Sequence, residues 1–360
     1  MARGKRGAFY NTLEEFHKYW DRIDVITPRI TNYELRITNQ FGNVFVHPSP
    51  LPLILQPLWI TKRGLELHRK NKFDLMTVHE YPPFYNGIGA RLLWNKIKVP
   101  YILEIHHIPG YPRSGNLKEE LYKSFLKVLI EWDSSKALAV RVVNQSQVPK
   151  FLNSSGVPKE KIIYIPSIYV DFDIFKPLNL AKEYDLIFVG RLEKNKGVDL
   201  LLEAASKLKV KSEKLKILVV GEGPLLENLK FKVKSLKLEN NVIFHGWAKD
   251  QKEIAELLNK SKILLMPSYN EGGPRVVFEA MACGVPVIAT PVGLAKDIIV
   301  NGESGEVVDW NADIMVQKAS ELLSDSNKYE RYKKNGLEIA GKFEKKSAIK
   351  NYADKLKNLI

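Results

Sequence analysis

The chain has 360 residues, of which 45% are hydrophobic and 27% are charged. This balance is ordinary for a globular protein, and the length allows two domains with sizeable cores. This hydrophobic content excludes a disordered chain. A small disulfide-stabilised protein is excluded as well, because the single cysteine, Cys283, cannot form an internal disulfide or a thiolate metal cluster. The apolar neighbours of Cys283 favour a buried packing thiol in a reducing compartment.

The net charge of +14 is concentrated in the first half of the chain. Residues 1–180 carry 25 lysines and arginines against 16 acidic residues, whereas residues 181–360 carry 30 against 25. A basic surface attracts phosphates, acidic polymers or anionic lipids, although solubility alone explains the surplus equally well. The basic residues are scattered and form no recognised nucleic-acid-binding module, so we expect no nucleic acid partner.

No stretch of the sequence resembles a membrane span or a secretory signal. The first residues, MARGKRGAFYNTLEEF, are basic but lack an apolar core. The longest apolar run, LPLILQPLWI at 51–60, has about half of the ~20 residues that a span requires, and prolines interrupt it. We therefore expect a soluble, cytoplasmic protein that at most rests on the inner face of a membrane.

Short β-branched runs alternate with helical stretches along the whole chain. In the first half the expected strands lie at 23–28, 43–49, 74–80, 100–107, 137–144 and 161–167, with a helix at 117–132 among the helical stretches between them. In the second half the pattern is clearer, with strands at 184–190, 216–223, 241–247, 262–268, 285–291 and 305–309. Continuous apolar strands separated by helices are typical of parallel sheets covered on both faces.

This pattern predicts an α/β protein of two doubly wound, Rossmann-like domains that face each other across a cleft. We place the linker at 169–179, which contains Pro177 and has little periodicity. The expected units are residues 1–175, residues 176–340 and a lysine-rich amphipathic helix at 341–360 that packs back toward the N-terminal domain. Because open parallel sheets bind ligands at the carboxyl ends of their strands, the residues after each strand are the functional candidates.

The most informative stretch is NEGGPRVVFEAMACG at 270–284, which follows an expected strand. Pro274 after two glycines is typical of a first helical position, and Gly284 marks an end, so we expect a helix over 274–283.

The start of this helix has the features of an anion site. Free N–H groups around Gly273, Arg275 and Val276 would face the cleft and attract an anion. Gly272 and Gly273 carry no side chain, so a phosphate could approach the backbone there.

Two carboxylates flank this expected anion site. Glu271 precedes it, and Glu279 lies within the helix. A carboxylate repels phosphate but accepts hydrogen bonds from vicinal hydroxyls, so we expect Glu271 to hold one hydroxylated ring and Glu279 another. A nucleotide diphosphate sugar has this layout. The alternative is a plain ion pair between Arg275 and Glu279, with Glu271 as an exposed loop acid.

Other strand ends of the second half supply candidate phosphate contacts. In VGRLEKNKG the strand ends at Gly190, and Arg191 and Lys196 both suit a diphosphate, although a solvated basic loop is the alternative. Gly221 and Gly223 in VVGEGP have the spacing of a phosphate turn, which is a weak signal because a helix entry explains it equally well.

Two further strand ends carry aromatic or histidine residues. Gly246 and Trp247 in FHGWAK could contact the base of a nucleotide, unless Trp247 lies at the edge of the core. His106 and His107 end a strand of the first half, where one of them could hold a transferring group or relay a proton. Adjacent strand residues face opposite sides, so at most one points into the cleft, and we favour His106. The segment at 79–89 could shape an acceptor site or serve as a structural loop.

Several motifs resemble glycosyltransferase family 4, a group of retaining, nucleotide-sugar-dependent enzymes with the two-domain GT-B fold. They are GRLEKNKG, VVGEGP, VIFHGW, LLMPSYNEGGPRVVFEAMACGVPVIATPVG and NGESG. The resemblance is dense from 184 to 310 and looser over 73–107 and 137–177. It implies that Glu271 and Glu279 form the family's two-glutamate motif, with the first near the donor sugar and the second on the ribose.

The resemblance also implies roles for the basic loop and the histidine. Arg191 and Lys196 would hold the donor diphosphate, Gly272 and Gly273 would offer N–H groups, and His106 would be the active-site histidine. Such enzymes usually need no metal or cofactor, because the basic pair and the helix dipole neutralise the leaving diphosphate. No residues of this sequence have metal-ligand spacing.

Two features depart from the family pattern. Family members usually begin with a strand and a glycine-rich loop, whereas this chain is expected to start at or after that loop, with Gly4 or Gly7 as its remnant and the first strand missing or shortened. The linker reads PSIYVDFDIFKP where the family often has Asn-Gly before Val-Asp.

The sequence thus predicts a retaining glycosyltransferase that moves a sugar from a UDP- or GDP-sugar to a hydroxyl of a glycan or lipid-linked acceptor. Two alternatives stay open. One is a nucleotide-sugar epimerase or sugar phosphorylase on the same scaffold, and the other is a non-catalytic protein that binds an anionic polymer.

Overall fold

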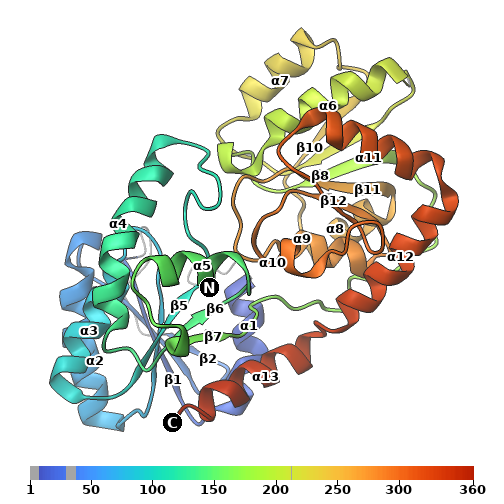
Figure 1. Ribbon diagram of the computed structural model, residues 1–360. Coiled ribbons are helices and arrows are strands. Elements are labelled where there is room, and N and C mark those ends of the chain that lie inside the picture. The colour runs from blue at the N-terminus through green and yellow to red at the C-terminus, as the bar shows by residue number, and fades with distance from the viewer. Residues whose placement is uncertain (1–7, 30–37, 212) are drawn as a thin grey trace.

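The computed structural model describes residues 8–29, 38–211 and 213–360 (Figure 1). Within these ranges two α/β lobes lie side by side, the first coloured blue to green and the second yellow-green to red. Gly4 and Gly7, the expected remnant of a glycine-rich loop, lie outside the described residues.

The first lobe holds two sheets. One has the order β1-β3-β2, with β1 (Ile23–Thr27) parallel to β3 (Val44–Pro48), and β2 (Thr38–Gln40) antiparallel to β3. The other is parallel throughout, in the order β4 (Met76–His79), β5 (Tyr101–Ile105), β6 (Ala139–Val142) and β7 (Ile162–Tyr164). The helices are α1 (Ala8–Phe16), α2 (Gln56–Asn71), α3 (Tyr85–Ile97), α4 (Leu117–Ser134) and α5 (Gln147–Ser154), with 3₁₀ turns η1 (His17–Tyr19), η2 (Leu53–Leu55) and η3 (Lys159–Lys161).

The second lobe is built on one parallel sheet of six strands in the order β10-β9-β8-β11-β12-β13. The strands are β8 (Tyr184–Val189), β9 (Ile217–Val220), β10 (Val242–Gly246), β11 (Ser261–Met266), β12 (Val287–Ala289) and β13 (Glu306–Val307). The helices are α6 (Val198–Lys211), α7 (Leu226–Ser235), α8 (Gln251–Asn259), α9 (Arg275–Ala282), α10 (Gly293–Ile298), α11 (Ala312–Ser324), α12 (Ser326–Gly341) and α13 (Lys345–Lys357), with the turn η4 (Lys194–Lys196).

Alternating strand residues supply two cores, one on each face of the second sheet. On β8, Leu186 and Phe188 point to one face, where α6 and α11 cover them. Ile187 points to the other face and packs into the cluster that contains Phe278 of α9. All three β8 residues are fully buried, which explains why the strand reads as an uninterrupted apolar run.

All twelve expected strands are present, and the structure adds one that the sequence did not reveal. This is β2, a run of three polar residues, TNQ, whose one partner strand within residues 8–29, 38–211 and 213–360 is β3. The first lobe also differs from the simple doubly wound pattern, because β1 and β4 do not pair and its sheet is divided in two.

The last helix, α13, leaves the second lobe and lies against α1 of the first (Figure 1). Its Tyr352 hydroxyl donates to Glu104 of β5, and Arg141 of β6 lies 3.9 Å above the Tyr352 ring. Arg141 also donates to Glu104, with a distance of 2.6 Å between Nη1 and Oε2. Burial alone would raise the pKa of Glu104, but Arg141, aided by His79 and His106, holds that pKa well below its usual range.

We expect Glu104→Ala to destabilise the protein by about 3–5 kcal/mol, because it leaves the buried guanidinium of Arg141 without its carboxylate. Urea unfolding measures this change. Lys350→Ala is a suitable control, since it removes an exposed ion pair with Asp354 on the same helix and should leave the free energy of unfolding nearly unchanged. Equal losses in the two variants would contradict the assignment of a buried anchor.

Candidate donor and active site

The acid loop, defined as residues 267–274, joins β11 to α9. Pro274 is the N-cap residue, with φ −73° and ψ 95°, so the helix begins at Arg275, one residue later than predicted. The free N–H groups at this start therefore belong to Arg275 and Val276. The next turn buries Val277 and Phe278 in the core, which fixes the direction of the helix.

Lys196 and Glu271 meet across the acid loop. Lys196 Nζ lies 2.5 Å from Glu271 Oε1, and the Ser268 hydroxyl donates to the same oxygen at 3.0 Å. Lys196 comes from η4, which ends at Gly197 with φ +66°. A β-carbon on Gly197 would lie 2.1 Å from the Pro267 carbonyl oxygen, so only glycine allows the basic loop to pack on the acid loop.

Arg191 does not join this pair. Its side chain is 59% exposed and forms an ion pair with Glu193 at 2.9 Å. Gly190, before it, packs over the ring of Phe188 at the end of β8. Of the two basic residues predicted to hold a diphosphate, the structure thus places only Lys196 against Glu271.

Gly221 and Gly223 have a packing reason for lacking side chains. A β-carbon on Gly221 would lie 1.9 Å from the Gly190 carbonyl oxygen, and one on Gly223 would lie 2.5 Å from that of Leu192. The two glycines therefore let the loops after β8 and β9 run against each other, which accounts for their spacing without a phosphate.

Gly246 and Trp247 end β10. Gly246 has φ +82°, and its carbonyl accepts from the Gly221 N–H at 2.7 Å. Trp247 is mostly exposed, so it is not the core-edge residue that the sequence left open as an alternative.

Glu279 is buried in α9, five residues or about one and a half turns after the N-cap Pro274. Burial raises the pKa of its carboxyl to about 7, although the guanidinium of Arg275 opposes the shift. Arg275 lies 4.6 Å above the ring of Tyr169.

The two histidines at the end of β5 point to different partners. The ring of His107, not that of His106, contacts the second lobe, because His107 Nε2 lies 2.7 Å from Asn270 Oδ1 in the acid loop. His106 Nε2 lies 3.1 Å from Glu104 Oε2, and its ring stacks on His79 with centroids 5.1 Å apart. His106 meets the acid loop through its carbonyl oxygen, which would lie 1.7 Å from a β-carbon on Gly272.

His79, Glu104 and His106 bring three potential metal ligands within 4.8 Å of one another. The guanidinium of Arg141 already occupies the shared carboxylate oxygen at 2.6 Å. A metal ion there would face this fixed positive charge, so the group fits a hydrogen-bonded histidine pair better than a cation site.

Amide side chains that the sequence analysis did not single out hold the two lobes together. Asn144, after β6, donates to the Gly272 carbonyl at 3.4 Å. Gln147 donates to the Pro291 carbonyl at 2.5 Å and accepts from the Gly293 N–H at 2.7 Å. The sequence could have indicated these amides, because each follows a strand. Asn144 and Gln147 lie in VNQSQ after β6, and Asn270, which contacts His107, precedes Glu271 in NEGG.

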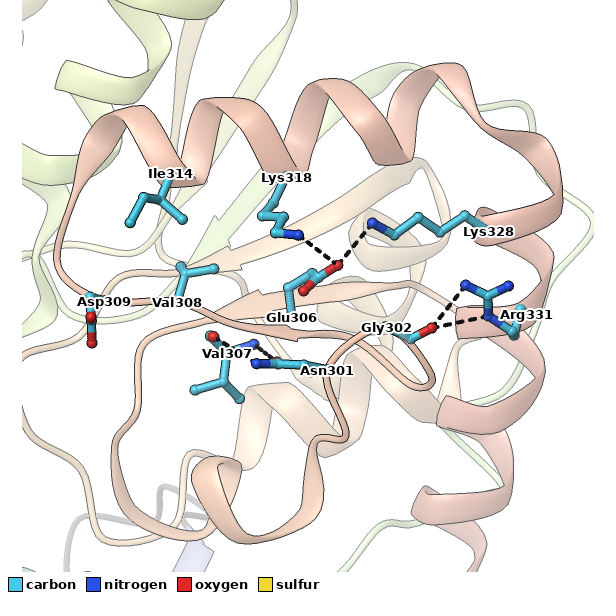
Figure 2. Close-up of a pocket in the computed structure, with 10 residues that line it drawn as sticks. All are labelled: Asn301, Gly302, Glu306, Val307, Val308, Asp309, Ile314, Lys318, Lys328 and Arg331. Atoms are coloured by element: carbon cyan, nitrogen blue, oxygen red, sulfur yellow. Dashed lines mark hydrogen bonds and ion pairs between the residues drawn. The ribbon is translucent and has the colours of Figure 1, made fainter.

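A pocket of about 580 Å³ lies elsewhere in the second lobe, between β13, α11 and α12 (Figure 2). None of the site residues predicted from the sequence lines it, although Asn301 and Gly302 belong to the NGESG motif. It is lined by Asn301, Gly302, Glu306, Val307, Val308, Asp309, Ile314, Lys318, Lys328 and Arg331.

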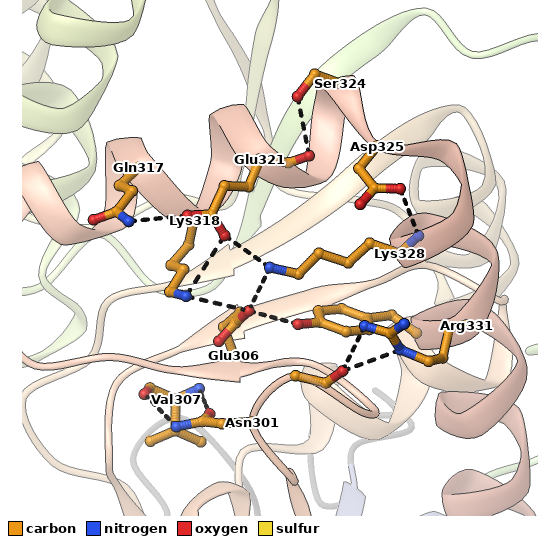
Figure 3. Close-up of polar contacts among 12 residues, drawn as sticks. Asn301, Glu306, Val307, Gln317, Lys318, Glu321, Ser324, Asp325, Lys328 and Arg331 are labelled. Atoms are coloured by element: carbon orange, nitrogen blue, oxygen red, sulfur yellow. Dashed lines mark hydrogen bonds and ion pairs between the residues drawn. The ribbon is translucent and has the colours of Figure 1, made fainter.

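The two lysines of this pocket pair with two acids, Glu306 and Glu321 (Figure 3). The buried carboxylate of Glu306 accepts from the Tyr332 hydroxyl at 2.5 Å and pairs with Lys328 at 2.9 Å. Lys318 lies 3.7 Å from the same carboxylate, and Arg331 donates to the Gly302 carbonyl. The network joins β13 to α11 and α12, so we interpret these charges as stabilising the fold.

Known proteins with the same features are glycosyltransferases. The sequence profile described as "Glycosyl transferases group 1" matches residues 170–357. An uncharacterised glycosyltransferase of Methanocaldococcus jannaschii is 30% identical over 389 residues, covering 98% of this chain and 95% of that protein. N-acetyl-alpha-D-glucosaminyl L-malate synthase of Bacillus anthracis is 28% identical over 319 residues, covering 84% of this chain and 77% of that protein.

Solved structures share the whole fold. Sucrose-phosphate synthase from Thermosynechococcus elongatus superposes with a TM-score of 0.80 at 18% identity, covering 98% of this chain and 92% of that one. Anabaena HepE in complex with UDP-glucose gives 0.76 at 20% identity, covering 99% and 97%. The fold is therefore GT-B, the architecture of a large class of glycosyltransferases. Within that class, this chain belongs to the glycosyl transferases group 1 family.

We expect Gly272→Ala to prevent the observed contact between the lobes, because its β-carbon would overlap the His106 carbonyl. Sugar transfer should fall roughly tenfold to a hundredfold through misplacement of the acid loop, while circular dichroism shows both lobes folded. Gly341→Ala, at the end of α12 with nothing near its β-carbon position, should leave transfer unchanged. Full activity of Gly272→Ala would show that this contact is dispensable.

The raised pKa of Glu279 predicts a pH dependence of stability. The folded protein keeps this proton up to about pH 7, whereas the unfolded chain releases it near pH 4.5, so the free energy of unfolding should fall with rising pH between these values. The loss approaches roughly 3 kcal/mol above pH 7. Relative to wild type, Glu279→Gln should become more stable by about this amount from pH 5 to pH 8 in urea unfolding. If the unfolding free energies of wild type and Glu279→Gln changed in parallel between pH 5 and pH 8, Glu279 would be ionised in the folded protein at both pH values.

Proposed function

We propose that the protein transfers a sugar from a nucleotide diphosphate sugar to an acceptor hydroxyl, with retention at the anomeric carbon. The observation that carries the proposal is the acid loop, where Lys196, Glu271 and the free N–H groups of Arg275 and Val276 gather at the start of α9. The solved complexes of Anabaena HepE with UDP-glucose, and with UDP and glucose, support a nucleotide-sugar donor by analogy.

The donor diphosphate is proposed to lie against the start of α9. Its negative charge would be met by the N–H groups of Arg275 and Val276 and by the ammonium of Lys196. Arg191, which is exposed and pairs with its neighbour Glu193, has a long side chain that can swing toward a bound phosphate. Because Lys196 and the N–H groups at the start of α9 are in place before the reaction, they would stabilise the charge that develops as the diphosphate leaves.

The two acids would hold the rings on either side of the diphosphate. Glu271 would accept hydrogen bonds from hydroxyls of the donor sugar while Lys196 and Ser268 keep its carboxylate in place. Glu279 would accept those of the ribose, which favours its ionised form over the protonated one. Trp247, exposed at the end of β10, would pack near the base.

The first lobe would supply the acceptor side. The side chain of His106 is 36% exposed, whereas the ring of His107 is held by Asn270 of the acid loop. We assign His106 to the transferring group, with its ring oriented by Glu104. The departing diphosphate would help to deprotonate the acceptor on the front face of the sugar. Among residues 184–211 and 213–341 we find no obvious nucleophile for the opposite face of the sugar.

No metal is assigned to this reaction, because Lys196 and the start of α9 provide the positive charge that a metal would supply. The acceptor is proposed to be a glycan or a lipid-linked sugar at the inner face of a membrane. No helix among the described residues combines the length and apolar character needed to cross a bilayer.

Lys196→Met and Glu271→Gln should each lower transfer at least about tenfold with folding intact, because each removes one side of the 2.5 Å pair at the diphosphate. A thermal-shift panel of UDP-, GDP- and ADP-sugars identifies the donor for the assay, since the bound ligand raises the melting temperature. Lys230→Met, which removes an exposed pair with Glu227 on α7, is the matched control and should be fully active.

Wild-type turnover in both site variants would refute the assignment of the acid loop. Formation of an isomerised donor without transfer to an added acceptor would favour the epimerase alternative. The anomeric configuration of the product tests retention, and unchanged turnover in a chelator tests independence from metal.

A further inference from the structure

Helix α4 carries an apolar stripe that faces away from the protein. At 100° per residue its five members fall within an arc of about 80°, and over 1.5 Å per residue they extend about 22 Å. Each side chain is between 45% and 84% exposed. The members of this α4 stripe are Leu117, Leu121, Phe125, Val128 and Trp132.

The opposite side of the same helix already packs in the core. Leu126 and Ile130 are fully buried there, so the helix does not need the stripe to hold its place in the fold. Single exposed apolar residues are common on soluble proteins, but an ordered row of large ones is characteristic of an interaction surface.

Cations and indoles gather where the stripe ends. Arg91 of α3 lies 4.9 Å from the ring of Trp132, and Lys98 Nζ lies 4.1 Å from the ring of Trp94. Lys136 Nζ lies 5.9 Å from the Trp94 ring. Indole rings favour the level of lipid headgroups, and lysine and arginine beside them can reach the phosphates. An apolar stripe that ends in such a cluster matches an anionic bilayer surface.

The other end of the stripe lies beside the contact between the two lobes. α4 follows the loop after β5, and its Glu119 accepts from Asn270 of the acid loop at 3.0 Å. Midway along the stripe, the ring of Phe125 stacks on Phe84, with centroids 6.0 Å apart, next to the exposed Tyr81. In Figure 1 α4 stands on the outer side of the first lobe, with its first turn toward the second lobe.

We propose that the α4 stripe lies in the headgroup region of an anionic lipid bilayer and so presents the cleft to a lipid-linked acceptor. The second part of this statement rests on the proposed function, whereas the docking itself depends only on the surface. The stripe enters the boundary between headgroups and acyl chains, and Arg91, Lys98 and Lys136 meet the lipid phosphates.

Vesicle cosedimentation tests the docking. The wild-type protein should bind vesicles of phosphatidylcholine with phosphatidylglycerol more tightly than vesicles of phosphatidylcholine alone. The triple variant Leu117→Gln, Leu121→Gln, Val128→Gln should lose at least about tenfold in affinity, because three side chains no longer enter the apolar layer. The double variant Val210→Gln, Phe231→Gln removes equally exposed residues of α6 and α7 and should bind like wild type.

A second pair of substitutions tests the charged end. Lys98→Gln with Lys136→Gln should weaken binding to the anionic vesicles and flatten its dependence on salt, with little effect on neutral vesicles. Equal binding of wild type and the triple variant would overturn the proposal. A second outcome would also overturn it: the wild type is a dimer that does not bind vesicles, and the triple variant is a monomer. The stripe would then join two copies of the chain.

The nucleotide-induced thermal shift, measured without vesicles, separates this proposal from the donor site. The triple variant should show the wild-type shift, because the stripe lies outside the acid loop. If the wild type shows no shift with any donor but still binds anionic vesicles through α4, the donor proposal fails and the docking surface stands.

Discussion

The contact between Gly272 and the carbonyl oxygen of His106 is the constraint on which the rest of the site depends. A β-carbon at position 272 would lie 1.7 Å from that oxygen, so the two lobes can approach this closely only where the acid loop has no side chain. Around it, Asn270 meets His107 and Asn144 meets the Gly272 carbonyl. The groups proposed to bind the donor lie in the second lobe, and the end of β5 in the first lobe packs against the acid loop that carries them. Meeting of the lobes would therefore complete the site and exclude water from it.

The charges of the acid loop differ in kind from those of the pocket beside β13. In that pocket Lys318 and Lys328 both pair with two carboxylates, those of Glu306 and Glu321, so the two charges of each sign balance. In the acid loop the Lys196–Glu271 pair lies next to the start of α9, which adds positive potential and has no acidic residue in its first turn. A diphosphate would therefore be attracted to the acid loop more strongly than to the pocket beside β13. The pocket beside β13 is thus not the best candidate for the donor.

Much of the fold followed from the sequence because apolar runs report burial directly. Strands such as β8 and β11 are buried on both faces and were visible as continuous apolar segments, whereas the polar β2 depends on a partner strand and was not. The helix after the acid loop was placed within one residue at each end, because a Gly-Pro start and a glycine stop are local signals.

The site was predicted less completely, for a physical reason. Lys196 and Glu271 were named because each follows a strand, and they do meet, but the roles of Gly221 and Gly223 depend on backbone packing between two loops. Contacts across the lobes, such as that of Gln147 with Gly293, join amide groups 146 positions apart and leave no periodic trace. The choice between His106 and His107 likewise depends on which ring contacts the second lobe. The position of a residue along one strand does not contain that information.

The most direct measurement is a crystal structure of the protein with the nucleoside diphosphate that stabilises it best. The account predicts that the diphosphate accepts hydrogen bonds from the N–H groups of Arg275 and Val276 and lies beside Lys196, with the ribose hydroxyls on Glu279. A nucleotide bound instead between β13 and α12, or a diphosphate remote from the start of α9, would contradict it.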